Sequence, residues 1–307
     1  MTKLANYDKY DYDYKDYWDN RSYEDLAERN LINKALNYQK GERFIDIGGS
    51  YGRLVDTYKD RYAQCIIVDY SLKTLQKYSV GIKKFAPNCT LIAANAYNLP
   101  FKDNSFDGGM MVRVLHHIED LEGYTSELHR VLSNNSLFLQ EFANKVHIKA
   151  FIKSLLTLRF SQLDTRPYQQ PSKGSNEGSK GEETVFLNYH PRHVRKIMEK
   201  NELIILGKKG CSFLRSDGLK KIMTTEQLMW FERIFQTILG WTNIPPSIFY
   251  TLRAFKDSNR SVVLGKIDDV IVCPKCKRSM RSIKHEYHCK SCNLRFKYKG
   301  GVWDLRI

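Results

Sequence analysis

The stretch "RFIDIGGSYGRL", residues 43–54, joins a short apolar run to a glycine-rich turn. Phe44, Ile45 and Ile47 predict a buried strand of a parallel sheet, because both faces of such a strand are covered. The turn that follows has few side chains, so its backbone can lie close to a ligand. It lacks the Gly-x-Gly-x-x-Gly that binds pyrophosphate, and no Gly-Lys-Ser/Thr of a phosphate-binding loop follows. We therefore expect a ligand that is not held through phosphates.

From residue 44 to residue 142, apolar strand patterns alternate with helical patterns. The predicted strands are 43–47, 65–69, 89–94, 106–112 and 136–142, and the predicted helices are 52–62, 71–79 and 121–132. This alternation predicts right-handed strand–helix–strand units and an α/β, doubly wound, Rossmann-like sheet. A helix over residues 22–36 is expected to pack on that sheet.

After residue 142 the alternation stops, and residues 143–190 are interpreted as an insertion that caps the sheet. Within it, the Ser-, Gly- and Lys-rich segment 171–183 is predicted to be a flexible loop. Three further elements are expected: a helix over 190–201, a strand over 203–208, and one or two helices over 219–240. A last strand is expected over either 247–255 or 261–267, and the choice between them stays open. We divide the chain into residues 1–40, an N-terminal arm and helix, residues 41–258, the sheet domain, and residues 259–307, a C-terminal tail.

Composition places the chain among globular proteins, with 307 residues of which 42% are hydrophobic. The N-terminus is rich in Asp, Lys and Tyr and has no apolar core, so we expect neither a signal peptide nor a membrane anchor. No stretch predicts a membrane span. We therefore expect a cytoplasmic protein, and the oligomeric state stays open.

Positive charge is concentrated in two segments. Residues 143–225 contain 16 Lys and Arg against 7 Asp and Glu, a net charge of +9. Residues 260–307 contain 12 against 4, a net charge of +8. This excess is compatible with a polyanionic partner such as RNA and equally with lysines that only keep the protein in solution.

Four of the seven cysteines are clustered in the C-terminal tail. Cys273 and Cys276 bracket two residues, twelve residues follow, and Cys289 and Cys292 bracket two more. In a cytosolic chain this spacing favours metal over disulfides, and four thiolates suit a closed tetrahedral zinc site with a structural role. We expect one Zn²⁺ that folds a small ribbon.

Polar residues stand at the ends of the predicted strands, where open parallel sheets bind their ligands. Asp46 precedes the glycine turn, and Asp69 lies about twenty residues beyond Gly48, the separation expected for an acid on ribose hydroxyls. The third strand leads to Asn95 and Ala96, and the fourth leads to "VRVLHH".

Together these motifs resemble the class I S-adenosylmethionine-dependent methyltransferases of the methyltransferase-11 type. "FIDIGGSYG", "VDYS", "ANAYNLPFKDNSFD", "LHH" and "LHRVL" are similar to that family's motifs over residues 18–142. Two positions depart from the pattern, because Ser50 replaces the middle glycine and Asn95 replaces the usual Asp. An Asn can still accept from the adenine amine through its side-chain carbonyl.

The resemblance implies S-adenosylmethionine as cofactor, with Asp46, Gly48, Gly49, Ser50 and Gly52 among its binding residues and the glycine turn allowing its close approach. It implies Asp69 and Tyr70 at the ribose, and Asn95 and Ala96 at the adenine. His116, His117 and His190 are the candidate bases, and His116 and His190 are preferred because both can face the methyl end of the cofactor.

The tail resembles the zinc-ribbon activator partner of tRNA and protein methyltransferases, here fused into one chain. We expect its zinc to take no part in catalysis and its loss to leave cofactor binding largely intact. The favoured function is methyl transfer to a small-molecule or lipid-like acceptor enclosed by the insertion and the aromatic N-terminal arm. Two alternatives remain: an RNA methyltransferase that uses the basic cap and ribbon, and a non-catalytic cofactor-binding scaffold.

Overall fold

A computed structural model describes residue 8 and residues 13–158, 163–169, 185–256 and 262–307. The predicted flexible loop at 171–183 lies outside the described residues. The strands are β1 (Gly41–Ile47), β2 (Tyr62–Asp69), β3 (Cys89–Ala93), β4 (Phe106–Met111), β5 (Leu132–Ala143), β6 (Tyr168–Gln169), β7 (Leu187–Asn188), β8 (Leu203–Cys211), β9 (Ser247–Ala254), β10 (Arg281–Ile283), β11 (Glu286–Cys289), β12 (Leu294–Lys299) and β13 (Val302–Asp304). The α-helices are α1 (Ser22–Ala35), α2 (Leu72–Phe85), α3 (Leu121–Val131), α4 (Ile148–Leu156), α5 (Pro191–Lys200), α6 (Asp217–Ile222), α7 (Thr225–Ile238) and α8 (Ile267–Val270).

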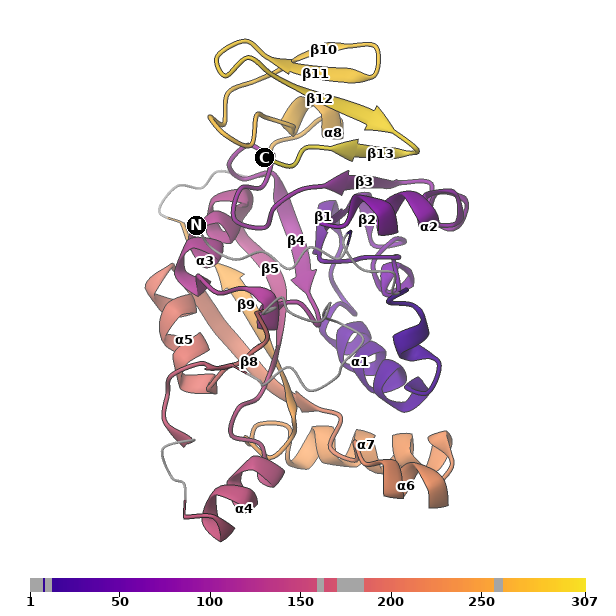
Figure 1. The fold of residues 1–307 in the computed structure, drawn as a ribbon, viewed down its shortest axis with the longest axis vertical. Coiled ribbons are helices and arrows are strands. Elements are labelled where there is room, and N and C mark those ends of the chain that lie inside the picture. The colour runs from indigo at the N-terminus through magenta and orange to yellow at the C-terminus, as the bar shows by residue number, and fades with distance from the viewer. Residues whose placement is uncertain (1–7, 9–12, 159–162, 170–184, 257–261) are drawn as a thin grey trace.

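The core of the molecule is a sheet of order β10-β11-β12-β13-β3-β2-β1-β4-β5-β9-β8. Strands β3, β2, β1, β4 and β5 are mutually parallel, β9 pairs antiparallel with β5, and β8 pairs antiparallel with β9. The order of the parallel strands reverses between β1 and β4, the position at which open α/β sheets bind ligands. The prediction of a Rossmann-like α/β fold with parallel strands is confirmed (Figure 1).

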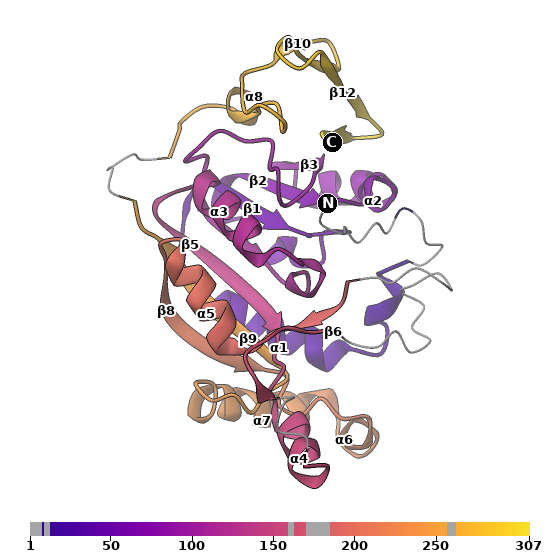
Figure 2. The ribbon, with the colours of Figure 1, turned by 60° about the vertical axis from the view of Figure 1, so that its left-hand side comes forward.

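Helices cover both faces of the sheet, as a doubly wound arrangement requires. On β2, Ile66 and Val68 belong to one apolar cluster and Cys65 and Ile67 to the other, following the two-residue alternation of a strand. Helices α3 and α5 pack in the first cluster, and α1, α2 and α7 in the second (Figure 2). The apolar side chains of the central parallel strands are thereby removed from water on both faces.

The helix predicted over residues 52–62 is wrong. The segment forms turns and one short 3-10 helix, Val55–Thr57. Thr57 hydrogen-bonds through its side-chain hydroxyl to the carbonyl of Leu54, at 2.7 Å, and thus competes with the helical backbone pattern. Two β-branched residues in the segment also lower its helix propensity. Buried Leu54, Val55 and Tyr58 instead pack as a turn on the sheet.

The elements predicted between residues 190 and 267 are confirmed except for one of the two alternatives for the last strand. The stretch 219–240 is a helix pair, α6 and α7, and the alternative of a last strand over 247–255 is confirmed as β9. The alternative at 261–267 is wrong, because its described residues hold no strand and α8 begins at Ile267. The helix expected over 190–201 is α5, with Pro191 at its first position.

The C-terminal tail is joined to the sheet through hydrogen bonds. Strands β10 to β13 form antiparallel hairpins, and β13 then pairs in parallel with β3, with Trp303 opposite Ile92 and Asp304 opposite Ala93 (Figure 1). Val302 and Leu305 are fully buried against the two core clusters. The tail therefore extends the sheet, whereas the sequence pattern alone describes an appended ribbon.

Candidate functional site

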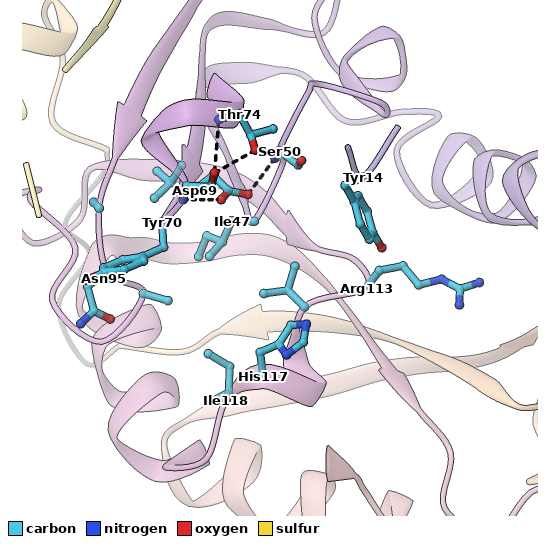
Figure 3. A pocket seen from close by; sticks show the side chains of 16 residues that line it. Tyr14, Ile47, Ser50, Asp69, Tyr70, Thr74, Asn95, Arg113, His117 and Ile118 are labelled. Atoms are coloured by element: carbon cyan, nitrogen blue, oxygen red, sulfur yellow. Dashed lines mark hydrogen bonds between the residues drawn. The ribbon is translucent and has the colours of Figure 1, made fainter. Parts of the chain in front are cut away.

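An open pocket lies where the carboxyl ends of β1, β2 and β4 meet (Figure 3). Its empty volume is about 870 Å³, the open mouth included. The lining side chains come from the glycine turn, the ends of the four parallel strands and the N-terminal arm: Tyr14, Ile47, Gly48, Ser50, Val68, Asp69, Tyr70, Ser71, Thr74, Ala94, Asn95, Ala96, Arg113, Val114, His117 and Ile118. The pocket thus occupies the switch point of the sheet.

The glycine turn after β1 is shaped by backbone geometry that side chains would obstruct. Gly48 has φ +76°, and a Cβ there would lie 2.2 Å from the side chain of Val114. Gly52 has φ +74°, and a Cβ there would lie 3.1 Å from Ile82. Ser50 also has a positive φ, 48°, so the serine that replaces the family glycine takes the left-handed conformation nonetheless. Gly52 supports the turn from behind and does not line the pocket.

Asp69 holds the turn and faces the pocket at the same time. Its carboxylate accepts a hydrogen bond from the Ser50 amide at 3.0 Å and another from the Ser71 amide at 2.8 Å (Figure 3). Burial raises the pKa of Asp69 to about 6, against the lowering effect of these amides. An ionised carboxylate there has lone pairs left for hydroxyl donors.

The far side of the pocket is formed by Tyr70 and the loop that follows β3. Asn95 is buried, and its Oδ1 accepts from the Tyr97 amide at 3.0 Å, which holds the loop in a turn. Ala96 lines the pocket beside it. An amide oxygen has two lone pairs, so Asn95 retains one for a further donor.

Arg306, near the end of the chain, contacts this side of the pocket from the tail. Its Nη1 donates to the Tyr70 carbonyl at 3.3 Å and pairs with Asp8 at 2.7 Å. Asp8 in turn accepts from the Lys73 amide and the Ser71 hydroxyl at the first turn of α2. The ion pair of Arg306 with Asp8, which we call the latch, therefore links the N-terminal arm, the pocket and the C-terminal tail.

A smaller cavity adjoins the pocket and shares Tyr14, Gly48, Ser50 and Arg113 with it. Asp46 lines this cavity, and Gly49 lies beside it in the turn.

Asp46 is held there in a buried carboxylate site. The Tyr58 hydroxyl donates to Asp46 at 3.0 Å, and burial raises the pKa of Asp46 to about 7. The nearby Arg53 lowers that pKa and stacks 3.6 Å from the Trp18 ring. This end of the site thus combines an acid and a cation.

Arg113 was missed by the sequence analysis, although "VRVLHH" places a charged residue directly after a buried strand. Its amide donates to Glu141 at 2.8 Å and its Nε donates to Glu28 at 2.6 Å. Burial alone would lower the pKa of Arg113, but the Glu28 and Glu141 carboxylates raise it well above its usual value. Arg113 is therefore a fixed positive charge at the junction of the two cavities.

The candidate histidines are placed differently from the prediction. His117 lines the pocket, whereas His116 does not and instead packs against Phe186, with ring centroids 4.3 Å apart. His190 caps α5 and lines a separate cavity with Val146 and Leu163. The structure therefore does not bring the predicted pair, His116 and His190, together at the cofactor pocket.

His117 is held as a neutral imidazole. Its Nδ1 lies 2.9 Å from the Val185 carbonyl, and because a carbonyl only accepts, Nδ1 carries the hydrogen. Burial lowers the pKa of His117 to about 4. The pKa of His116 is also lowered well below its usual value, by burial and by the neighbouring His117 and Arg113.

The four tail cysteines meet at one point. The sulfurs of Cys273, Cys276, Cys289 and Cys292 all lie within 4.8 Å of one another, and those of Cys276 and Cys289 are 3.6 Å apart. Zinc–thiolate bonds of about 2.3 Å place tetrahedral sulfurs about 3.8 Å apart.

The backbone around these cysteines repeats the same turn twice. Lys277 and Asn293, which directly follow the second cysteine of each pair, both adopt positive φ, 58° and 53°. This donor set therefore fits a single tetrahedral metal ion.

Part of this chain is similar in sequence to known methyltransferases. Residues 45–139 match the family model described as a methyltransferase domain. A demethylmenaquinone methyltransferase of Paenarthrobacter aurescens is 29% identical over 38% of this chain and 46% of its own length. A 2-phytyl-1,4-naphtoquinone methyltransferase of Nostoc is 38% identical over 22% of this chain and 31% of its own length. The chain spans about half or less of the length of these curated relatives.

Solved structures share the fold at low sequence identity. A chain from a complex between the Haloferax volcanii Trm112 methyltransferase activator and a methyltransferase aligns with TM-score 0.53 and 13% identity, over 80% of this chain and 99% of that one. An S-adenosylmethionine-dependent methyltransferase from Listeria monocytogenes aligns with TM-score 0.51 and 11% identity, over 76% and 98%. Residues 45–139 therefore match a methyltransferase-domain model, part of the chain matches two curated relatives named as methyltransferases, and the solved structures share the fold of this chain.

Proposed function

We propose that the protein transfers a methyl group from S-adenosylmethionine to a small-molecule or lipid-like acceptor and that one structural Zn²⁺ holds its C-terminal ribbon. The observation that carries the proposal is Asp69, a carboxylate at the end of β2 that two backbone amides orient beside the glycine turn. An acid at this position is suited to a ribose diol. The cofactor supplies the methyl group when it is bound.

The residues around the pocket divide the proposed cofactor into parts. Asp69 accepts hydrogen bonds from the ribose hydroxyls. Asn95 and the Ala96 amide recognise the adenine, which lies beside Tyr70. At the other end, Asp46 suits the amino group of the methionine part, and Arg113 suits its carboxylate by charge. Gly48, Gly49 and Ser50 keep the backbone between these two ends free of large side chains, while Gly52 supports the turn.

In this proposal the chain contributes alignment and, for some acceptors, a base. Methyl transfer is an in-line displacement, so a fixed cofactor and an acceptor held at its methyl end supply much of the rate. His117 replaces His116 as the candidate base, because its imidazole lines the pocket and is neutral. Tyr14 of the N-terminal arm lines the same pocket and would shield the reacting atoms from water.

A small acceptor is favoured by the two curated relatives described above, which are named as quinone methyltransferases, and by the apolar side chains Val114 and Ile118 in the pocket wall. RNA stays the alternative because the ribbon exposes a row of cations: Arg281, Lys284, Lys290, Arg295, Lys297 and Lys299. Binding of bulk RNA through these cations should fall steeply with salt, with a log–log slope of about −0.7 for each single-strand phosphate contacted.

Calorimetric titration with S-adenosylmethionine tests the proposal directly. We expect binding that Asp69→Ala weakens by about 1–3 kcal/mol, because the ribose hydroxyls would lose their buried acceptor. Ser216→Ala, a change outside the pocket, serves as the control. If the folded protein binds no cofactor, the methyltransferase proposal fails. Tight, salt-dependent RNA binding that Lys284→Ala, Lys290→Ala and Arg295→Ala together abolish in a folded protein would replace the small acceptor by RNA.

A further inference from the structure

Helix α4 presents its apolar side to solvent. Its large apolar residues, Ile148, Phe151, Ile152, Leu155 and Leu156, follow one stripe at spacings of three and four and are 41–81% exposed. The residue that α4 buries is Ser154. A helix that only covered the core would have the opposite orientation. Ile148 and Phe151, at the start of the stripe, line a cavity with Leu163, and Leu156, at its end, is 81% exposed.

Helices α6 and α7 add further exposed apolar side chains at the same end of the molecule. They are Ile222, Trp230, Phe231, Ile238 and, just after α7, Trp241. Figure 1 and Figure 2 both place α4, α6 and α7 at the end opposite the ribbon.

Two hydrogen bonds tie these elements together. Lys149 Nζ donates to the Arg215 carbonyl at 3.3 Å, and the Ile148 amide donates to the Ile244 carbonyl at 3.0 Å. We call these exposed side chains of α4, α6, α7 and Trp241 the apolar end.

Cations surround the apolar end. In residues 145–158 and 208–241 the exposed charged side chains are Lys149, Lys153, Lys209, Lys221 and Arg233, against Asp217 and Glu226. Indole rings and branched aliphatic side chains, interspersed with lysines, are the composition of surfaces that lie in the lipid headgroup region. The positive excess is complementary to anionic lipid.

Other occupants fit less well. Residues 170–184 contain no large apolar side chain that would match the stripe in composition. A second copy in a two-fold dimer would bring two copies of the same positively charged surface together. Among the described residues, no helix is long and apolar enough to cross a bilayer.

We propose that the apolar end docks the protein onto an anionic lipid surface, lying in the interface without crossing it. Helix α4 follows β5 directly, and its first residues line the cavity that also contains His190. The protein would thus meet a lipid-like acceptor at the edge of the sheet where the parallel strands have their carboxyl ends. This last link rests on the proposed function, whereas the docking itself does not.

Vesicle sedimentation with the full-length protein tests the docking without cofactor or acceptor. We expect binding to phosphatidylglycerol-containing vesicles, weak binding to pure phosphatidylcholine vesicles, and a loss of binding when salt rises from about 0.05 M to about 0.5 M. Ile152→Asp with Leu156→Asp should weaken binding about tenfold or more. Val80→Asp is the matched control, because Val80 is 80% exposed on α2, near the ribbon.

The outcomes separate the alternatives. Circular dichroism and cofactor titration on each variant show whether it is folded, and both side chains changed on α4 are exposed. Equal vesicle binding by the α4 variant and the wild type would overturn the proposal, as would no binding by the folded wild type. A dimer in analytical ultracentrifugation that the α4 variant dissociates, without vesicle binding, would assign the apolar end to a second copy. Vesicle binding without cofactor binding would contradict the proposed function only.

Discussion

Removing the metal is expected to weaken the methyltransferase domain itself, and not only the ribbon. The perturbation is Cys276→Ser, or a chelator on the wild type. The sequence pattern predicts that cofactor binding survives this change. The pairing of β13 with β3 predicts otherwise, because the loop that carries Asn95 begins where β3 ends.

The magnitude follows from what β13 and the adjoining residues bury. Val302 and Leu305 are fully buried in the core clusters, and each such side chain contributes about 1.5–3 kcal/mol. Their release costs about 3–6 kcal/mol, against a total stability of roughly 5–15 kcal/mol. For a domain of this size, 1 kcal/mol shifts Tm by roughly 2–4 °C, so a decrease of about 6 °C or more is expected.

The assay is thermal unfolding together with titration of S-adenosylmethionine, with and without bound zinc. Lys275→Ser is the matched control, because Lys275 is exposed between the two ligands of the first pair and is not itself a ligand. An unchanged Tm and unchanged cofactor affinity after verified metal loss would refute the reasoning and show that the ribbon folds independently.

Three further predictions concern single residues. Arg306→Ala should weaken cofactor binding by about 0.5–1 kcal/mol in calorimetry, since the part-exposed pair with Asp8 steadies Tyr70; an unchanged affinity would show that the latch is irrelevant to the pocket. Cofactor affinity should decrease as pH falls through about 6, because the raised pKa of Asp69 means that its acceptor carboxylate is protonated below that pH, and titrations at about pH 5 and about pH 8 measure this. In the cofactor-free protein the same raised pKa has the opposite consequence: the contribution of Asp69 to stability is present below the unfolded pKa and is lost as pH rises through about 6. Arg113→Met should lower the free energy of unfolding by about 1.5–3 kcal/mol in urea titration, because Glu28 would lose a charged hydrogen bond and keep only its second cationic partner, Arg53.

Local patterns in the sequence determined the parts of this protein that local forces decide. The apolar run before Gly48 specifies a buried parallel strand, and the glycines specify a turn with positive φ. The position of Asp69 at the end of β2 follows from strand periodicity, and the cysteine spacing brings four sulfurs together because each pair occupies one tight turn. These features need only neighbours in sequence or the regular geometry of a parallel sheet.

Tertiary structure alone decided the rest, because it depends on contacts between segments far apart in the chain. Pairing of β13 with β3 joins residues about two hundred positions apart, and no periodicity within either strand indicates it. His117 rather than His116 lines the pocket because a short 3-10 turn, not a regular helix, sets the direction of each ring. No helix is predicted from the sequence within the insertion, and only the tertiary structure shows that α4 packs Ser154 inward and leaves its apolar stripe exposed.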